Sequence, residues 1–183
     1  FRTIFGDNAA EKVIASAKNI VRGRIDLLGL KNLDIGIDVD WNCEPLSRKR
    51  SPLMHWRAYE ALGTAETGDK KIIWELNRHQ YFITLGQAYW LTGDEHYGDI
   101  FANHLDEWMA QNPPKLGINW ASSLEVAFRS IAWLWSLYFF KNSNSLTPQT
   151  FSKALQLLYI NARHLESYLS TYFSPNTHLT GEA

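Results

Sequence analysis

The chain has 183 residues, of which 45% are hydrophobic, and its 18 Lys and Arg nearly balance its 19 Asp and Glu, giving a formal net charge of −1. This length suits one domain or a piece of one, and this charge excludes the broad basic surface of a nucleic-acid binder or a polybasic membrane-surface protein. The single cysteine, Cys43, excludes an internal disulfide framework. No apolar run approaches the roughly 20 residues that cross a bilayer, so we expect no membrane insertion.

The first third of the chain predicts one helix and a long connection. Apolar residues recur at helical spacing over residues 8–28, and Gly29 is the predicted stop. Over residues 29–68 this periodicity is lost among Asp, Asn, Pro, Gly and Ser residues. A connection of this length is typically functional when it carries aromatic residues such as Trp41. We therefore expect residues 1–68 to form a leading helix followed by a long loop.

Residues 69–183 predict helical hairpins. Helical periodicity recurs in four segments, with a fifth opening near the end of the chain: 69–91, 95–111, 121–141, 147–169 and 177 onward. No convincing period-2 strand pattern is found, so the predicted fold class is all-α, built from antiparallel helical hairpins. The chain begins at Phe1 without Met and ends at Ala183 without a helix-stop signal, and we interpret both ends as cut.

The predicted helix over 69–91 is apolar around most of its circumference. Four polar residues spaced by three or four positions nevertheless form one stripe along it: Asn77, Gln80, Thr84 and Gln87. A polar stripe on a mostly buried helix indicates either a buried hydrogen-bond network or the wall of a wet cleft.

Four short segments combine Asn with Trp or His: 40–42, 74–80, 117–125 and 174–178. Amide, imidazole, guanidinium and indole groups together are typical of carbohydrate recognition, because planar rings stack on sugars while the polar groups bind hydroxyls and carboxylates. The sequence contains no glycine-rich phosphate loop, no nucleophile elbow and no zinc-ligand spacing. We therefore expect neither a cofactor nor a metal.

Most of these segments also have a structural interpretation, which stays open at this point. Ser122 and Glu125 have the spacing of a capping box, and Glu125 and Arg129 have that of a helix ion pair. Glu75 is spaced to pair with Arg78 or with the residue after it. In this interpretation the segments stabilise helices and bind no ligand.

The last segment and the remaining histidines have similar structural interpretations. Asn176 or Thr177 is then the N-cap of the last helix, and His178 is an ordinary first-turn residue. Three other histidines lie beside charged residues in helical patterns and are expected to be solvated: His96, His104 and His164.

Taken in order, four motifs resemble the heparinase II/III-like polysaccharide lyase family: IWELNRHQ at 73–80, LTGD at 91–94, GINWASSLEVAFR at 117–129 and SPNTHLTGEA at 174–183. The resemblance covers nearly everything from Asp40 to the end. It implies a toroid of paired helices followed by a β-sandwich region. We therefore expect this chain to be the N-terminal fragment of an incomplete (α/α) toroid, with the rest of the toroid and the β-sandwich region absent.

The resemblance also implies a reaction, the β-elimination of a uronic-acid-containing polysaccharide. A base removes the C5 proton, the bond to O4 breaks, and the site stabilises charge on the neighbouring carboxylate. In the family an Asn beside a His at a helix start binds that carboxylate, which implies Asn176 and His178 as catalytic residues. Family members often have Asn immediately before His, whereas here Thr177 lies between Asn176 and His178. Either Asn176 is shifted by one position, or Thr177 occupies the position of the Asn. The family's tyrosine base lies beyond residue 183, in the C-terminal remainder of the chain.

The matching motifs further imply a substrate groove. Its expected lining residues are Trp41, Asn77, Arg78, His79, Asn119, Trp120, Glu125, Arg129 and Thr177. The expected partner is an acidic polysaccharide, heparin-like or heparan sulfate-like, alginate-like or a bacterial exopolysaccharide, and not a nucleic acid. The resemblance implies a periplasmic or secreted bacterial protein, and we expect the fragment alone to be inactive.

Two alternatives remain at this point. An (α/α) toroid glycoside hydrolase needs two carboxylates flanking the bond, and Glu75, Glu125 and Glu182 are available for that role. A helical-repeat module that binds a partner without catalysis needs only the hairpins.

Overall fold

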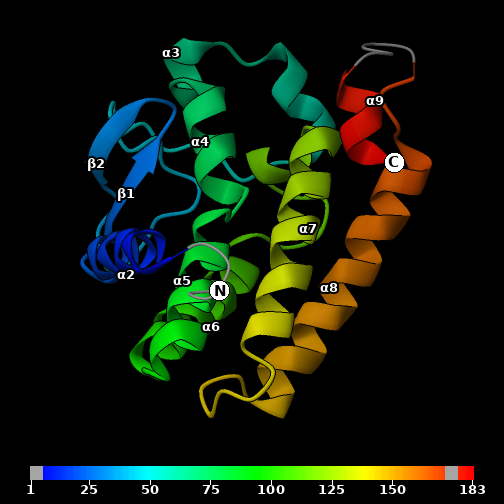
Figure 1. Cartoon of the computed structure of the whole chain (residues 1–183). Coiled ribbons are helices and arrows are strands. Elements are labelled where there is room, and N and C mark those ends of the chain that lie inside the picture. Colours follow the sequence, from blue (N-terminus) through cyan, green and yellow to red (C-terminus); the bar gives the residue numbers. More distant parts are fainter. Residues whose placement is uncertain (1–5, 172–176) are drawn as a thin grey trace.

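The computed structural model describes residues 6–171 and 177–183. It consists of helices and one small antiparallel hairpin (Figure 1). In chain order the elements are α2 (Asp7–Val21), β1 (Arg24–Leu27), β2 (Leu30–Asp34), η1 (Trp56–Ala61), α3 (Thr64–Thr67), α4 (Lys70–Asn77), α5 (Tyr81–Thr92), α6 (His96–Gln111), η2 (Ile118–Trp120), α7 (Ser123–Phe139), α8 (Pro148–Ser167) and α9 (Thr177–Glu182).

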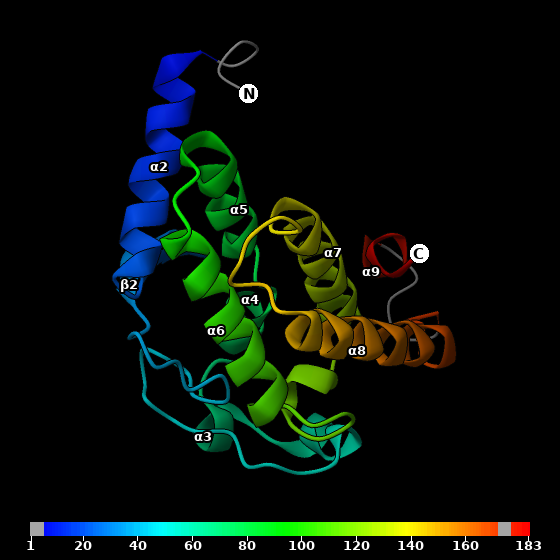
Figure 2. The ribbon, with the colours of Figure 1, turned by 90° about the horizontal axis from the view of Figure 1, so that it is seen from below.

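The helices form two rows. Helices α2, α5, α7 and α9 follow one another in the first row, and α6 and α8 pack against it as the second row (Figure 2). Antiparallel pairs α5–α6 and α7–α8 are therefore the repeating unit. This confirms the predicted all-α class of antiparallel hairpins and gives the arc expected of part of an (α/α) toroid.

The first predicted helix, over residues 8–28, is wrong in its last third. Helix α2 ends at Val21, and a hairpin follows in which Ile25 pairs with Leu33. Gly23 has φ +73°, and a Cβ there would lie 2.4 Å from the carbonyl oxygen of Gly36. The chain therefore leaves the helix at this glycine. The alternation of buried and exposed residues over β1 is only four residues long, which is too short to stand out from helical periodicity.

The predicted helix over 69–91 is two helices. Helix α4 ends at Asn77 and α5 begins at Tyr81, because His79 has φ +57°. The His79 ring is fully buried and stacks on Phe82 with ring centroids 4.6 Å apart. Packing of this side chain therefore breaks a segment that local periodicity predicts to be continuous.

The core is rich in tryptophan. Four indoles are completely buried: Trp41, Trp108, Trp120 and Trp133. They come from the long loop, α6, η2 and α7, so the loop packs into the same core as the helices. The segment over 29–68 is accordingly packed and carries β2, η1 and α3. Within the described ranges, no helix is long and apolar enough to cross a membrane.

Candidate functional site

Asn77, at the end of α4, is enclosed by hydrogen-bond partners. Its Nδ2 donates to the carbonyl oxygens of Trp41 at 3.0 Å and Ile73 at 2.7 Å, and its Oδ1 accepts from Trp108 Nε1 at 2.7 Å. A side-chain amide offers two donors and one carbonyl acceptor, and here all are used. Asn77 thereby fixes the loop at Trp41 to α4 and α6. The polar stripe is a buried hydrogen-bond network at this position.

Asn119, in η2, binds the same loop carbonyl from the other side. Its Nδ2 donates to the Trp41 oxygen at 3.1 Å and to Asn112 Oδ1 at 2.9 Å. Two amides 42 positions apart in sequence therefore converge on one backbone oxygen. The Trp41 ring is itself completely buried, so it packs inside the fold and does not cover an open groove.

Arg129 completes this group from α7. Its guanidinium is fully buried, with Cζ 4.4 Å from the Trp108 ring centroid and 5.6 Å from that of Trp120. Nη1 donates to the backbone oxygen of Asn119 at 3.1 Å, whereas Nε and Nη2 have no partner among the described atoms. Burial lowers the pKa of Arg129 to about 9, although the charge of Glu125 opposes the shift.

His79 lies against the same core. Trp133 Nε1 donates to His79 Nδ1 at 2.8 Å. Burial, together with the charge of Arg129, holds the pKa of His79 well below its usual range, so the ring is neutral and the other ring nitrogen carries its proton. We call Trp41, Asn77, His79, Asn119, Trp120 and Arg129 the buried network.

The expectation of solvated histidines is wrong at two of three positions. His96 is exposed, but His104 and His164 are buried. Tyr81 and His104 Nδ1 share a hydrogen bond of 2.8 Å, and burial lowers the pKa of His104 to about 4. His104 and His164 lie on the faces of α6 and α8 that pack against the core. Neighbours in the sequence lie on other faces of a helix, so their charge does not predict whether the histidine is exposed.

Arg78 forms an ion triad beside the buried network. Its Nε and Nη2 donate to Glu125 Oε2 and Oε1 at 2.6 and 3.0 Å, and Nη1 lies 2.7 Å from Glu75 Oε2. The predicted Glu75–Arg78 pair is thus confirmed. Arg78 also lies over the Phe128 ring, with Cζ 4.7 Å from its centroid. Two carboxylates of the same chain pair with this cation, so its charge is neutralised by intramolecular ion pairs.

The local interpretation of Glu125 is wrong. Ser122 is the N-cap residue of α7 but makes no capping hydrogen bond through its side chain. Glu125 pairs with Arg78, which lies 47 positions away, and not with Arg129. A bidentate bond to a guanidinium is stronger than a single bond to a backbone amide, so the long-range partner takes the carboxylate.

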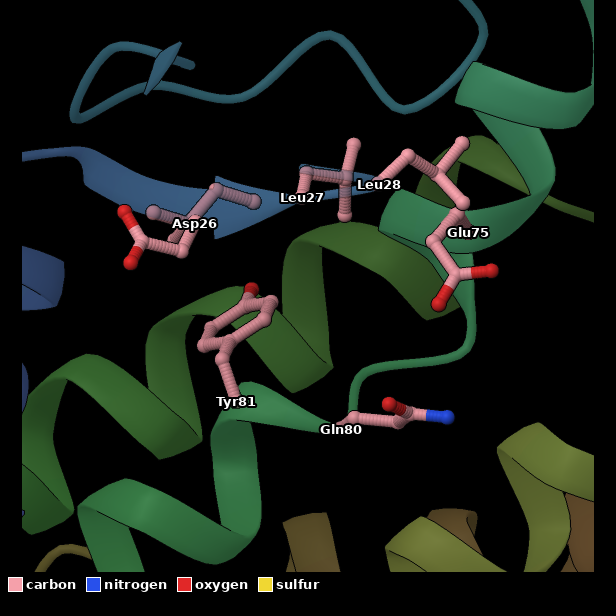
Figure 3. Close-up of a pocket in the computed structure, with 7 residues that line it drawn as sticks. Asp26, Leu27, Leu28, Glu75, Gln80 and Tyr81 are labelled. Atoms are coloured by element: carbon pink, nitrogen blue, oxygen red, sulfur yellow. The ribbon is translucent and has the colours of Figure 1, made fainter. Parts of the chain in front are cut away.

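A pocket of about 250 Å³ lies where β1 meets the junction of α4 and α5 (Figure 3). Asp26, Leu27 and Leu28 line it from the hairpin, and Glu75, Gln80 and Tyr81 line it from the helices. The sequence pattern does not predict this pocket, because it does not predict the hairpin that forms one of its walls. The one available signal was Gln80 in the polar stripe, which borders a cleft at this position.

Helix α9 carries His178 and packs against α7. A Cβ at Gly181 would lie 2.7 Å from Leu124 Cδ1, so the two helices meet closely at this glycine. Glu182 is buried and accepts a hydrogen bond of 2.7 Å from the Ser170 backbone nitrogen. Asn176 and the side chain of Thr177, which the sequence also singled out, lie outside the described residues.

The structure thus separates the predicted site residues into three groups. The buried network holds six of them behind the surface, the ion triad uses Arg78 and Glu125, and α9 carries His178. The carboxylates proposed for a hydrolase are also bound within the fold, Glu75 and Glu125 by Arg78 and Glu182 by Ser170. In the part of the chain that the structure describes, no three potential ligands are grouped to hold a metal.

Known proteins resemble this chain in sequence and in fold. A heparin-sulfate lyase of Bacteroides thetaiotaomicron is 32% identical over 115 residues, which are 61% of this chain and 16% of that protein. A heparin-sulfate lyase of Pedobacter heparinus is 24% identical over 153 residues, 80% of this chain and 19% of its own length. The chain therefore spans less than a fifth of these curated relatives.

Solved structures share the fold. The crystal structure of heparan sulfate lyase HepC from Pedobacter heparinus has a TM-score of 0.73 and 20% identity, covering 96% of this chain and 24% of that one. A heparinase III with methylated lysines has a TM-score of 0.72 and 21% identity, covering 94% of this chain and 26% of that one. Residues 9–183 match the sequence profile of the family described as Heparinase II/III N-terminus, and the chain belongs to this family.

Proposed function

We propose that the protein is a polysaccharide lyase that cleaves a uronic-acid-containing polysaccharide of the heparin and heparan sulfate class by β-elimination. The observation that carries this proposal is the family match over residues 9–183, together with relatives that are heparin-sulfate lyases. Residues 1–68 and 69–183 supply the first arc of the toroid. The rest of the toroid, the β-sandwich region and the tyrosine base belong to the C-terminal remainder of the chain, so this fragment alone is inactive.

In this proposal His178 binds the substrate carboxylate from the start of α9, with Asn176 or Thr177 beside it. Removing the C5 proton places negative charge next to an existing carboxylate. Hydrogen-bond donors that strengthen as this charge develops lower the barrier. The close packing of α9 on α7 at Gly181 supports the proposal, because a fixed helix start is what holds such donors in place.

The buried network and the ion triad act as positioning groups in this proposal. Asn77 and Asn119 hold one loop carbonyl, and Arg129 holds η2 through the Asn119 oxygen. Arg78 ties the end of α4 to Glu125 in the first turn of α7, the helix against which α9 packs. These residues therefore set where α9 stands and leave contact with the polymer to other side chains.

We also propose that the protein works in the periplasm or outside a bacterial cell. The curated relatives are bacterial, and a lyase must reach a polymer that is too large to enter the cell intact.

Ultraviolet absorbance of the unsaturated product tests the lyase proposal. The full-length protein is incubated with heparin, heparan sulfate, alginate and hyaluronan. We expect a rise with heparan sulfate or heparin that His178→Ala and Asn176→Ala both abolish. His96→Ala is the matched control, because His96 is an exposed histidine on a different helix, and it leaves the rate unchanged. Release of reducing ends without absorbance would instead establish a hydrolase.

A further inference from the structure

A second group of polar and aromatic side chains lies at the end of the molecule that also carries α9. It comprises Trp56 and Arg57 of η1, Lys115 of the loop before η2, and His164 and Tyr168 at the end of α8. Figure 1 shows η1, in teal, and the last turns of α8, in orange, at the same end of the molecule as α9. We call these five residues the cation–aromatic cluster. None of them belongs to the four motifs that resemble the lyase family.

Two cations share one aromatic ring in this cluster. Lys115 Nζ lies 5.0 Å from the Tyr168 ring centroid, and Arg57 Cζ lies 5.3 Å from the same centroid. Arg57 also lies 5.2 Å from the Trp56 ring, whose centroid is 4.9 Å from that of Tyr168. Each contact is a favourable cation–π interaction, but together they gather two positive charges around the same rings.

No carboxylate among the described side chains pairs with the charges of Arg57 and Lys115. Lys115 Nζ lies 2.5 Å from His164 Nδ1. This hydrogen bond uses one of the three N–H donors of the lysine ammonium group. His164 is buried, and burial lowers its pKa to about 3, so it stays neutral at physiological pH and supplies no charge. Arg78, by contrast, binds two carboxylates.

The backbone also holds Lys115 in an unusual conformation. Its φ is +66°, in the left-handed region that favours glycine, and its carbonyl oxygen accepts a hydrogen bond of 3.0 Å from the Trp56 nitrogen. The loop is thereby fixed to the start of η1. A long cationic side chain at a position where glycine would be less strained indicates that the side chain itself is used.

We infer that the cation–aromatic cluster binds an anionic sugar unit of an acidic polysaccharide, with Arg57 and Lys115 contacting its sulfate or carboxylate group while the Tyr168 ring holds the two cations together. This inference rests on the proposed function and adds a subsite to it. Arg57 is exposed and Lys115 is partly exposed, so both can reach a bound chain. An anion between them would balance two charges that the described side chains leave without an ion pair.

Affinity measured against salt tests the subsite. Dissociation constants of the full-length protein for a heparin oligosaccharide are determined at increasing sodium chloride for wild type, Arg57→Gln and Lys115→Gln. We expect each variant to bind about tenfold more weakly. The slope of log affinity against log salt falls by a little under one per cation, about 0.7 by analogy with single-stranded polyanions. Lys153→Gln, an exposed lysine near the opposite end of α8, is the control and changes neither quantity.

The outcomes separate this subsite from the proposed function. Wild type that binds and cleaves heparin, with unchanged affinity and slope in both variants, would overturn the subsite and leave the lyase proposal standing. Wild type that neither binds nor cleaves any acidic polymer would overturn both. Arg57→Gln keeps the test valid even if Lys115→Gln fails to fold, because the Arg57 side chain is exposed and its described contacts are two aromatic rings. Repeating the titration with unsulfated hyaluronan distinguishes a sulfate ligand from a carboxylate.

Discussion

The buried network and the cation–aromatic cluster both place cations on aromatic rings, and they differ in what surrounds the charge. Arg129 is buried against Trp108 and Trp120, and its Nη1 donates a hydrogen bond to a backbone oxygen. In the cation–aromatic cluster, Arg57 and Lys115 lie over Tyr168 at the surface. The same side-chain chemistry therefore fixes the fold in one place and remains available to a ligand in the other.

The two regions show that recurring polar and aromatic motifs do not by themselves mark a binding site. Asn, His, Arg and Trp in recurring motifs are typical of carbohydrate recognition, yet here the recurrent set is largely inside the protein. Buried polar groups need specific partners, so their identities and spacing are as restricted as those of a binding site. Changes in the two regions should accordingly separate effects on stability from effects on polymer binding.

The largest expected effect comes from Asn77→Ala. The substitution removes both amide donors to the loop and α4 and leaves the buried Trp108 indole N–H without an acceptor. We expect the free energy of unfolding to fall by about 3 kcal/mol. Urea denaturation followed by circular dichroism measures it. Gln87→Ala, in the same polar stripe and partly exposed, is the control and should cost less than about 1 kcal/mol. Equal losses in the two variants would contradict a special role for Asn77.

Acid should weaken the buried region through His104. Its pKa is about 4 in the folded protein and 6.5 in the unfolded chain, so the unfolded state binds more protons as the pH falls below 6.5. Stability therefore decreases between pH 6.5 and about 4, by up to about 1.4 kcal/mol per pH unit from this histidine. At pH 5 the total is about 2 kcal/mol.

Comparison of melting temperatures at pH 7 and pH 5 checks this dependence. His104→Gln removes the titrating group and should reduce the difference between the two temperatures. The matched variant is His96→Gln, because His96 is exposed, and it should leave the difference as it is in wild type. A pH dependence that survives His104→Gln in full would assign acid sensitivity to other groups.

A smaller effect is expected at the ion triad. Arg78→Gln removes a bidentate partner from Glu125 and the second ligand from Glu75, which leaves two neighbouring carboxylates partly buried. Because the triad borders solvent, we expect a loss of about 1.5 kcal/mol and not the larger cost of a fully buried pair. Denaturation in low and high salt measures it. The double variant Arg78→Gln with Glu125→Gln should recover part of the loss, and no recovery would argue against coupling between the two residues.

Local patterns predicted the helices but not the places where distant side chains decide the structure. Periodicity over 95–111, 121–141 and 147–169 matches α6, α7 and α8 to within a few residues. Gly23 and His79 break two further segments, in one case because the backbone approaches Gly36 and in the other because the ring is buried against Phe82. Neither contact can be predicted from the hydrophobic periodicity of the segment that it interrupts.

The candidate site shows the same limit. The polar stripe predicted either a buried network or the wall of a cleft, and its spacing on an apolar helix is a local signal. The structure has a network at Asn77 and a pocket at Gln80. The partner of Glu125 could not be read locally, since Arg78 is 47 positions away. The cation–aromatic cluster assembles residues from η1, a loop and α8, and no spacing rule connects them.

The smallest effect on stability is expected for Arg57→Gln, and it is the most informative test of the comparison. Arg57 is exposed and its described contacts are two aromatic rings, so the free energy of unfolding should change by less than about 0.5 kcal/mol. Affinity for heparin should nevertheless fall about tenfold, because the subsite loses one of its two cations. Asn77→Ala should show the opposite order, with loss of stability as its main effect and a smaller loss of affinity than Arg57→Gln where the variant remains folded. Urea denaturation and heparin titration of the same two preparations measure both quantities. If Arg57→Gln destabilised the protein as strongly as Asn77→Ala, the surface cations would be structural as well, and the distinction between the two regions would be lost.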